Sequence, residues 1–230
     1  DDPKKKFSEV EMKFFSMRWN SQTPERQEQV KQLVANGQLE LINGGWSMHD
    51  EACPTYEDMI ANMMFGHKFI LDNFGKKPRI GWQIDPFGHS NTNARFFAEM
   101  GFDALFFARI DYGDKDRRSA AKELEWVWRP ASDTLGDDVQ IFTHTLWNMY
   151  SAPQGFDFDI NSDDVQWINN EASKDFNADV EAKELMRLLD DRAAHYLTDD
   201  VLVLFGDDFR YMDAFQYYQS LDNMIEYMNK

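Results

Sequence analysis

Residues 79–90 read Arg79-Ile80-Gly81-Trp82-Gln83-Ile84-Asp85-Pro86-Phe87-Gly88-His89-Ser90. The large apolar residues Ile80, Trp82 and Ile84 stand at every second position, which is typical of a short buried strand. Pro78 ends the helical pattern that precedes this stretch. The pattern therefore predicts a strand over 80–84 that ends at Asp85.

The residues after this strand predict a stiff turn. Pro86 prevents the strand from continuing and Gly88 frees the backbone to turn, while Ser90 or Asn91 can cap a helix that begins near position 94. Asp85 is thus expected at the carboxyl end of a strand, where α/β sheets and barrels collect their reactive groups. For an isolated Asp-Pro pair, simple capping of the turn would be the better interpretation.

The composition sets broad limits. A chain of 230 residues with 43% hydrophobic and 15% aromatic residues can form one α/β domain, and no apolar run approaches the roughly 20 residues of a membrane helix. The net charge of −17 argues against nucleic acid or an anionic membrane as a partner. Because Cys53 is the single cysteine, neither an internal disulfide nor a thiolate metal cluster is expected. The first residues resemble the interior of a longer polypeptide, so the missing targeting signal says nothing about location.

The rest of the chain repeats a plan of strand, polar turn and helix, which predicts parallel strands with crossover helices. Residues 153–178 are polar and lack periodicity, which predicts a surface excursion or lid. Within them, 157–161 imitate a calcium loop, but Ser162 and Ile168 replace the required Gly and Glu, so we reject an EF-hand. The other expected strands are 7–12, 39–43, 104–108, 124–129, 140–145 and 201–205, and the expected helices are 24–35, 54–74, 94–100, 178–196 and 213–228.

Polar residues gather at the predicted strand ends, next to aromatic residues such as Trp46, Phe87, Tyr112, Trp147 and Phe209. Carboxylates beside aromatic faces are what a sugar-binding cleft needs, because ring C–H surfaces stack on aromatic rings while hydroxyls bind acids and Arg. The strand-end set expected on one side of the sheet is His49, Asp50, Glu51, Asp85, His89, Arg109, Asp111, His144, Tyr150, Asp207 and Asp208.

Four of these segments resemble the successive motifs of glycoside hydrolase family 38, the class II α-mannosidases. The run 84–90 is the most specific, residues 10–15 resemble the lysosomal branch, and the likeness extends from about residue 7 to 228. The other three segments are 43–52 with Asn43-Gly44-Gly45-Trp46, 107–112 with Ala108-Arg109-Ile110-Asp111, and 206–209 with Gly206-Asp207-Asp208-Phe209.

The resemblance implies a seven-stranded α/β barrel of mainly parallel strands, incomplete in this chain, which would be one fragment of the catalytic domain. It implies a Zn²⁺-dependent enzyme that hydrolyses terminal α-mannosyl residues of glycoprotein N-glycans with retention of configuration, in the lysosome or another acidic secretory lumen. Its partners would be the oligosaccharide substrate and the remaining segments of the same enzyme, and we also consider a homodimer.

The resemblance also assigns residues. Asp85 matches the nucleophile, which is one of the zinc ligands, and Asp208 matches the general acid/base. Phe87 and Arg109 match substrate-contacting positions, and so does Tyr150 on a looser alignment. For Asp50, the residues themselves balance pocket lining against helix capping, and we favour pocket lining.

One departure concerns the metal. The family's other zinc ligands are a His-x-Asp motif before the first of these segments and a His beyond the last, and neither is in this chain. Asp85 is the one family ligand present, so this chain alone is not expected to bind zinc tightly.

Other interpretations remain open. The chain could be a carbohydrate-binding fragment without turnover, or part of another metal-dependent α/β-barrel hydrolase, such as a deacetylase. Asp207-Asp208 could form a turn and helix cap, and His89 is expected to hold the Asp85 turn by hydrogen bonds rather than to react.

Overall fold

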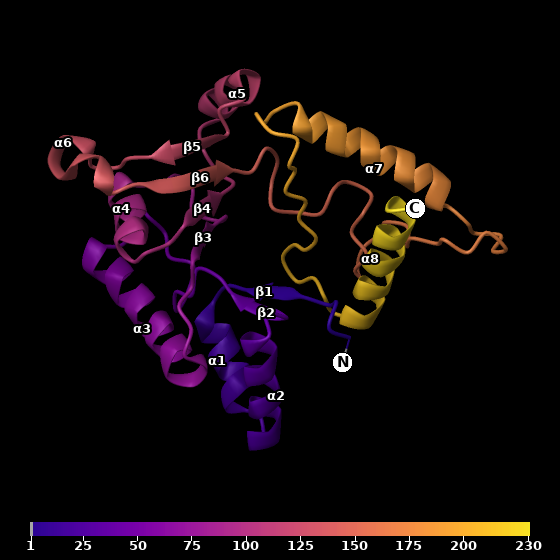
Figure 1. Cartoon of the computed structure of the whole chain (residues 1–230), viewed down its shortest axis with the longest axis horizontal. Coiled ribbons are helices and arrows are strands. Elements are labelled where there is room, and N and C mark those ends of the chain that lie inside the picture. Colours follow the sequence, from indigo (N-terminus) through magenta and orange to yellow (C-terminus); the bar gives the residue numbers. More distant parts are fainter. Residues whose placement is uncertain (1) are drawn as a thin grey trace. The chain divides into compact units, whose positions relative to one another are not determined.

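The computed structural model describes residues 2–230, which form two compact units (Figure 1). The first unit comprises residues 2–117 and 124–146, and the second comprises residues 118–123 and 147–230. Within residues 2–230, every helix is too short or too polar to cross a membrane.

The first unit contains two small sheets. Strand β1 (Phe7–Glu9) pairs in parallel with β2 (Leu39–Leu41). The second sheet has the order β3-β4-β6-β5, in which β3 (Ile80–Gln83), β4 (Ala104–Phe107) and β6 (Ile141–Thr145) are parallel. Strand β5 (Glu125–Trp128) runs antiparallel to β6. Six predicted strands therefore form, each shorter than predicted, and their mainly parallel arrangement is confirmed.

Asn43 links the two sheets of the first unit. Its backbone N–H donates to the carbonyl of Ile80 at 2.6 Å, and its side-chain Oδ1 accepts from the N–H of Trp82 at 3.1 Å. Asn43 is fully buried and has a φ of +54°, a left-handed conformation that Asn tolerates better than most residues. The end of β2 is thereby attached to the edge of β3.

The described residues form open, mixed sheets, and a closed seven-stranded barrel is not formed by residues 2–230. The predicted strand over 201–205 was wrong, since these residues have no ladder partner. Their backbone carbonyls bind side chains instead: Leu202 accepts from Arg192, and Phe205 accepts from Tyr211. An apolar run predicts a strand, but a strand forms only where another strand is available to bond its backbone N–H and C=O groups.

Helices cover the sheets of the first unit. The predicted cap at Ser90 is confirmed, because its side chain accepts from the N–H of Thr92, and Thr23 caps α2 by accepting from the N–H of Arg26. Helix α5, which was not predicted, continues into the second unit. The helices are α1 (Met12–Asn20), α2 (Pro24–Ala35), α3 (Tyr56–Phe74), α4 (Asn91–Glu99), α5 (Tyr112–Ala121) and α6 (Ser132–Leu135), followed by the 3-10 helix η1 (Gly136–Asp138).

Two apolar clusters stabilise the first unit. One lies between α4 and the larger sheet and includes the fully buried rings of Phe97 and Phe107. The other joins α1, α2 and α3 to β2 through Met12, Val34 and Ile70. Burial of large side chains in these clusters supplies the main driving force that holds the strand ends in place.

The second unit is built around α7 (Ala178–Ala193) and α8 (Ala214–Met228), which pack together. Residues 153–177 contain no helix or strand, but their rings Phe156, Phe158 and Trp167 are buried in the core of this unit. This segment is therefore held by its aromatic side chains. Its role as a lid stays a prediction.

Gly66, in the middle of α3, allows the helix to touch the turn that follows β2. A Cβ atom at this position would lie 1.9 Å from the carbonyl oxygen of Gly44 and 2.6 Å from the carbonyl carbon of Gly45. Both of those atoms belong to the backbone, so they cannot move aside as a side chain could. The approach of α3 to this turn therefore requires glycine.

We predict that Gly66→Ala lowers the free energy of unfolding by at least about 2 kcal/mol, because the added methyl group overpacks the contact. In an exposed helix the same change would instead stabilise by about 1 kcal/mol. Urea unfolding followed by circular dichroism measures the difference. Met64→Ala, on an exposed face of the same helix, is the matched control and should stay within about 0.5 kcal/mol of the wild type. An equally stable Gly66→Ala protein would contradict this packing.

Candidate active site

The carboxyl ends of β3 and β4 bring three predicted site residues together. Arg109, after β4, donates from Nη2 to Oδ1 of Asp85, after β3, at 3.1 Å. The guanidinium carbon of Arg109 lies 4.4 Å from the ring centroid of Phe87. The Asp85 side chain is 69% exposed, so its second oxygen can reach a ligand.

This arrangement presents an ionisable carboxylate beside an oriented cation and an aromatic face. The bond from Arg109 fixes the position of one oxygen of Asp85. Phe87 is 79% exposed, and Arg109 covers part of its ring. Chemically, the group can act as a nucleophile or as a metal ligand, and the exposed ring can stack against an apolar sugar face.

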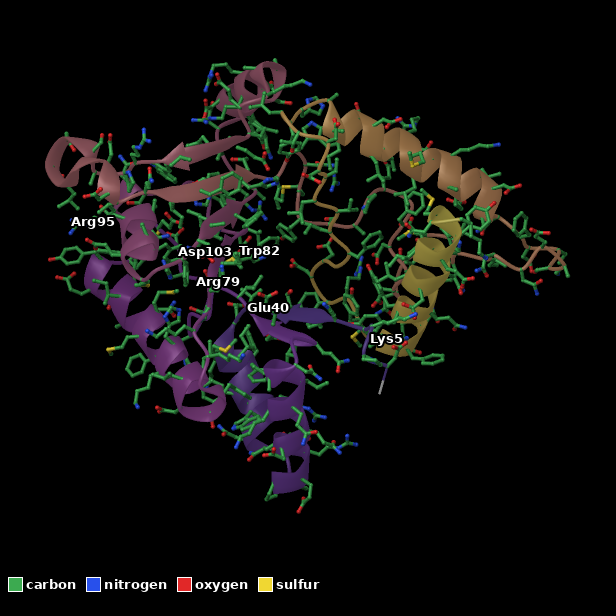
Figure 2. The ribbon with its side chains drawn as sticks, viewed as in Figure 1. Lys5, Glu40, Arg79, Trp82, Arg95 and Asp103 are labelled. Carbon is green, nitrogen blue, oxygen red and sulfur yellow. The ribbon has the colours of Figure 1, made fainter. Side chains whose placement is uncertain are left out.

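The amino ends of β3 and β4 contain a different kind of contact. There Arg79 and Asp103, at the beginnings of β3 and β4, form an exposed ion pair of 2.5 Å (Figure 2). Exposed pairs of this kind contribute at most about 1 kcal/mol. The candidate reactive carboxylate therefore lies at the carboxyl ends of the strands.

A buried carboxylate holds the turn that carries Asp85. Glu51 Oε2 accepts from the backbone N–H of Ser90 at 2.6 Å, and its Oε1 accepts from Gln83 Nε2 at 3.2 Å. Oε1 also lies 3.0 Å from Nδ1 of His89. One side chain from the loop after β2 thereby determines both ends of the turn over 84–90.

The hydrogen bonds of His89 show how this carboxylate is tolerated in the core. Nε2 of His89 lies 3.1 Å from the carbonyl oxygen of Arg109, which can only accept, so Nε2 carries a hydrogen. A second hydrogen must then lie between Nδ1 and Glu51. The hydrogen bonds that Glu51 accepts offset part of the cost of burying it. The ring stacks on Phe107 at 3.9 Å, and the expectation that His89 holds the turn is confirmed.

The loop after β2 is organised by hydrogen bonds of the same kind. His49 is buried and bonds through Nε2 to Asn93 at 2.9 Å, and through Nδ1 to Asn62 at 3.2 Å. Gln83 Nε2 donates to the carbonyl of His49 at 3.1 Å. His49 is thus a structural side chain of this loop.

Asp50 caps its own turn. Its Oδ2 accepts from the N–H groups of Cys53 at 2.7 Å and Ala52 at 3.2 Å. Hydrogen bonding from the side chain and backbone of Cys53 lowers the pKa of Asp50. The capping interpretation is therefore observed, while the assignment of Asp50 to substrate binding stays a prediction.

The end of β4 makes two hydrogen bonds that the sequence reasoning did not predict. Asp111 accepts from the N–H of Asp114 at 3.0 Å and so begins α5, and Lys115 donates to the carbonyl of Ala108 at 2.8 Å. Burial lowers the pKa of Lys115. The spacing Asp111-x-x-Asp114 is an N-terminal helix signal that could have revealed this helix.

The second unit contains the remaining predicted residues. Asp208 is exposed, and its N–H donates to the side chain of Asp207 at 2.7 Å. Tyr150 is half-buried in the same unit. The two candidate acids, Asp85 and Asp208, thus belong to different units, and their meeting across one sugar-sized gap stays a prediction.

His144 is the last residue but one of β6, so it lies near the carboxyl end of that strand, as predicted. Its Nδ1 is 2.8 Å from Oε1 of Glu125, directly opposite on the antiparallel neighbour β5. The sequence did not indicate this partner. This pair joins two strands of the sheet.

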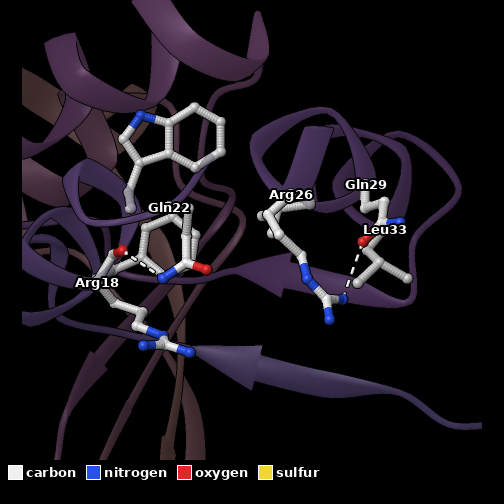
Figure 3. A pocket seen from close by; sticks show the side chains of 8 residues that line it. Arg18, Gln22, Arg26, Gln29 and Leu33 are labelled. Carbon is white, nitrogen blue, oxygen red and sulfur yellow. Dashed lines mark hydrogen bonds between the residues drawn. The ribbon is translucent and has the colours of Figure 1, made fainter. Parts of the chain in front are cut away.

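Two surface hollows are lined by other residues. One, of about 380 Å³, is formed by α1 and α2 and includes Arg18, Trp19 and Arg26 (Figure 3). The other, of about 520 Å³, lies between α7 and α8 and includes Arg187 and Tyr227. Neither contains a predicted site residue, so the chemistry, rather than the size of a hollow, identifies the candidate site.

The zinc ion that the resemblance implies has no complete site in the described chain. Within residues 2–230, no three side chains of His, Cys, Asp or Glu are arranged to hold a metal ion. Asp85 can offer one exposed oxygen, whereas a zinc site takes three or four protein ligands. The residues present therefore do not fit zinc by themselves.

The model of the glycosyl hydrolase family 38 N-terminal domain matches residues 1–230. The chain belongs to glycosyl hydrolase family 38. This family 38 chain is 43% identical over 228 residues to a lysosomal alpha-mannosidase of Dictyostelium discoideum, and 41% identical over 230 residues to an alpha-mannosidase of Canavalia ensiformis. These matches cover 99% and 100% of the chain.

The family 38 chain also resembles a solved structure. The crystal structure of an alpha-mannosidase from Enterococcus faecalis V583 matches with a TM-score of 0.68 and 18% sequence identity, over 98% of this chain and 22% of that one. At this identity the likeness concerns the fold alone. The chain spans 22% of the length of the Dictyostelium relative and 23% of that of the Canavalia relative.

We predict that Glu51→Ala lowers the free energy of unfolding by roughly 3 kcal/mol, because it leaves His89 and the Ser90 N–H buried without their acceptor. Urea unfolding of the variant and the wild type measures this loss. Glu28→Ala removes an exposed carboxylate from α2 and should change stability by less than about 0.5 kcal/mol. Equal stability of both variants would mean that Glu51 does not hold the turn.

Proposed function

We propose that this family 38 chain is part of a retaining α-mannosidase that removes terminal α-D-mannosyl residues from glycoprotein N-glycans. The observation that carries the proposal is the exposed Asp85 carboxylate, oriented by Arg109 on a turn that Glu51 holds. The lysosomal names of several relatives support action in the lysosome or another acidic lumen.

The first step would be attack by Asp85. Its free carboxylate oxygen forms a bond to the anomeric carbon while the bond from that carbon to the departing oxygen breaks. Asp208, in its protonated form, gives its proton to the departing oxygen. The sugar is left as an ester of Asp85, and Asp208 is left as a carboxylate.

The second step would release the sugar. Asp208 takes a proton from a water molecule, whose oxygen bonds to the anomeric carbon as the ester bond to Asp85 breaks. Two displacements on opposite faces restore the original configuration. This mechanism requires the two carboxyl groups to lie roughly 5 Å apart in the working enzyme.

Arg109, Phe87, Tyr150 and Asp50 would orient the sugar. The guanidinium of Arg109 holds Asp85 and would also donate to a sugar hydroxyl group. The exposed ring of Phe87 offers a stacking surface, and Tyr150 and Asp50 offer hydrogen-bonding groups. Support for the first two comes from the hydrogen bond of Arg109 to Asp85 and from the contact of Arg109 with the ring of Phe87.

We also propose that the whole enzyme uses Zn²⁺, with Asp85 as one of its ligands. When bound, the ion would supply Lewis acidity toward sugar hydroxyls. The other ligands would have to come from outside residues 2–230, since no further metal-binding set is present among them.

We predict that Asp85→Asn and Asp208→Asn each lower kcat for 4-nitrophenyl α-D-mannoside at least about 1,000-fold, because each removes one of two cooperating acids. Release of 4-nitrophenol by the protein that contains residues 1–230 in their native context measures the loss. Asp103→Asn, on the opposite edge of the sheet, is the matched control and should change kcat less than about twofold.

The same assay separates the alternatives. A protein that binds mannose without releasing 4-nitrophenol would be a binding module, and inversion of the released sugar, seen by NMR, would exclude the double displacement. Full activity of Asp85→Asn would contradict its role as nucleophile.

We predict that the chain 1–230, purified without chelator, retains less than about 0.1 zinc per molecule, because a lone carboxylate binds this ion weakly. Inductively coupled plasma mass spectrometry measures the content. The protein from its natural source should hold about one ion, and Asp85→Asn should lower that content. One tightly held ion in the chain 1–230 would contradict this prediction.

A further inference from the structure

The loop that carries Asp208 has a backbone that its own sequence does not favour. Phe209 has a φ of +56° and Tyr211 a φ of +61°, so two non-glycine residues adopt the left-handed conformation. This conformation is unfavourable for a residue with a Cβ atom, because the Cβ comes too close to a backbone carbonyl oxygen. Conformations of this kind persist where the surrounding contacts determine them. The contacts of the loop therefore decide where Asp208 is held.

The first contact is an ion pair that reaches the backbone of Asp208. Arg210 donates from Nε to Oδ2 of Asp157, and from Nη1 to the carbonyl oxygen of Asp208 at 3.4 Å. The side chains of Arg210 and Asp157 are mostly buried, at 26% and 15% exposure. The hydrogen bond to Asp157 is the main cause that raises the pKa of Arg210. One guanidinium group thus ties residue 157 to the candidate acid.

The second contact holds the far end of the loop. Asp159 is 1% exposed, and its two oxygens accept from the N–H groups of Met212 and Asn161, each at 3.0 Å. Burial by itself raises the pKa of Asp159, but these hydrogen bonds and the charge of Arg210 lower it, and the net pKa lies below the ordinary value of 3.8. Asp159 therefore stays ionised at moderately acidic pH, and its contribution to stability is lost only as the pH falls through this lowered pKa.

Asp157 and Asp159 flank a buried aromatic residue. Phe158, between them in the sequence, is 1% exposed, and its ring stacks on that of Phe205 with 6.2 Å between the ring centroids. Tyr211 donates to the carbonyl of Phe205 at 3.0 Å and stacks on Tyr217 at 4.2 Å. The segment 157–161 and the loop 205–212 are thus joined by side chains from both directions.

These contacts explain a motif that the proposed mechanism does not use. The spacing Asp157-x-Asp159-x-Asn161 imitates a calcium loop, but here the two carboxylates bind a guanidinium and backbone N–H groups. Asp159 satisfies the Met212 N–H of the strained loop and Asp157 binds Arg210, so within residues 2–230 the two carboxylates are not arranged around a metal ion. Since a bond to a fixed, charged acceptor is stronger than one to water, the pattern stabilises a single loop conformation.

We propose that Asp157, Asp159 and Arg210 are positioning residues for Asp208. This inference rests on the proposed function, in which Asp208 transfers the proton. None of the three touches the sugar. They act through the backbone of residues 208–212, by setting the position from which the carboxyl group of Asp208 reaches the departing oxygen.

This role has a kinetic signature that a merely structural role lacks. A misplaced acid slows substrates whose departing group is basic and needs a proton, such as methyl α-D-mannoside. It hardly slows 2,4-dinitrophenyl α-D-mannoside, whose departing group leaves without one. Loss of folded protein would instead lower the rates for both substrates by the same factor.

The test compares Asp157→Asn and Arg210→Lys in the protein that contains this chain in its native context. Each should lower kcat/KM roughly 10- to 100-fold for the methyl glycoside and less than about threefold for the dinitrophenyl glycoside. Asp163→Asn removes an exposed acid two residues beyond the segment 157–161. It is the matched control and should leave both rates unchanged. Thermal unfolding of each variant reports the folded fraction.

The outcomes separate the two proposals. Equal losses on both substrates, or no loss on either, would overturn the positioning role. Should Asp157→Asn not accumulate as folded protein, Arg210→Lys decides, because it keeps the positive charge and loses only the guanidinium geometry. If Asp208→Asn itself shows no dependence on the departing group, the assignment of Asp208 fails, and that failure is visible in this variant alone.

Discussion

The candidate site of the first unit depends on one buried carboxylate. Glu51 accepts hydrogen bonds from the Ser90 backbone and the Gln83 side chain and shares a hydrogen with His89. His89 in turn donates to the backbone of Arg109, the residue that orients Asp85. A single side chain thus relates the ends of three strands. The cost of its burial is offset in part by these hydrogen bonds.

The second unit has a similar arrangement, in which a buried carboxylate holds the backbone next to a candidate reactive acid. Asp159 is buried and satisfies the backbone beyond Asp208, as Glu51 satisfies the backbone beyond Asp85. In both cases the candidate reactive acid is exposed while its support is buried. An exposed carboxylate is available to a ligand, whereas a buried one makes stronger hydrogen bonds because water does not compete. In each unit, one exposed carboxylate is the candidate reactive group, and a different, buried carboxylate holds the backbone near it.

Much of the local structure could be predicted from the sequence. The alternation over 80–84, the stop at Pro86 and the cap at Ser90 all act over a few residues, and the strand, turn and α4 form accordingly. Features that depend on distant partners were missed. The antiparallel direction of β5, the lack of a partner for 201–205 and the use of Glu125 by His144 each depend on which segment lies alongside, and local patterns carry no such information.

The sequence by itself determined the family motifs, the identity of Asp85, Arg109 and Asp208 as candidate site residues, and the strand-end position of Asp85. The strand-end position of Asp85 follows from residue types at short spacing, where sterics and capping dominate. The assignment of Asp85, Arg109 and Asp208 to the site follows from the resemblance to family 38. Only the tertiary structure decided that Glu51 and Asp159 support these residues. The sequence around a carboxylate in a polar loop is the same whether the side chain faces solvent or the core. The packing of distant segments decides which of these two environments it has.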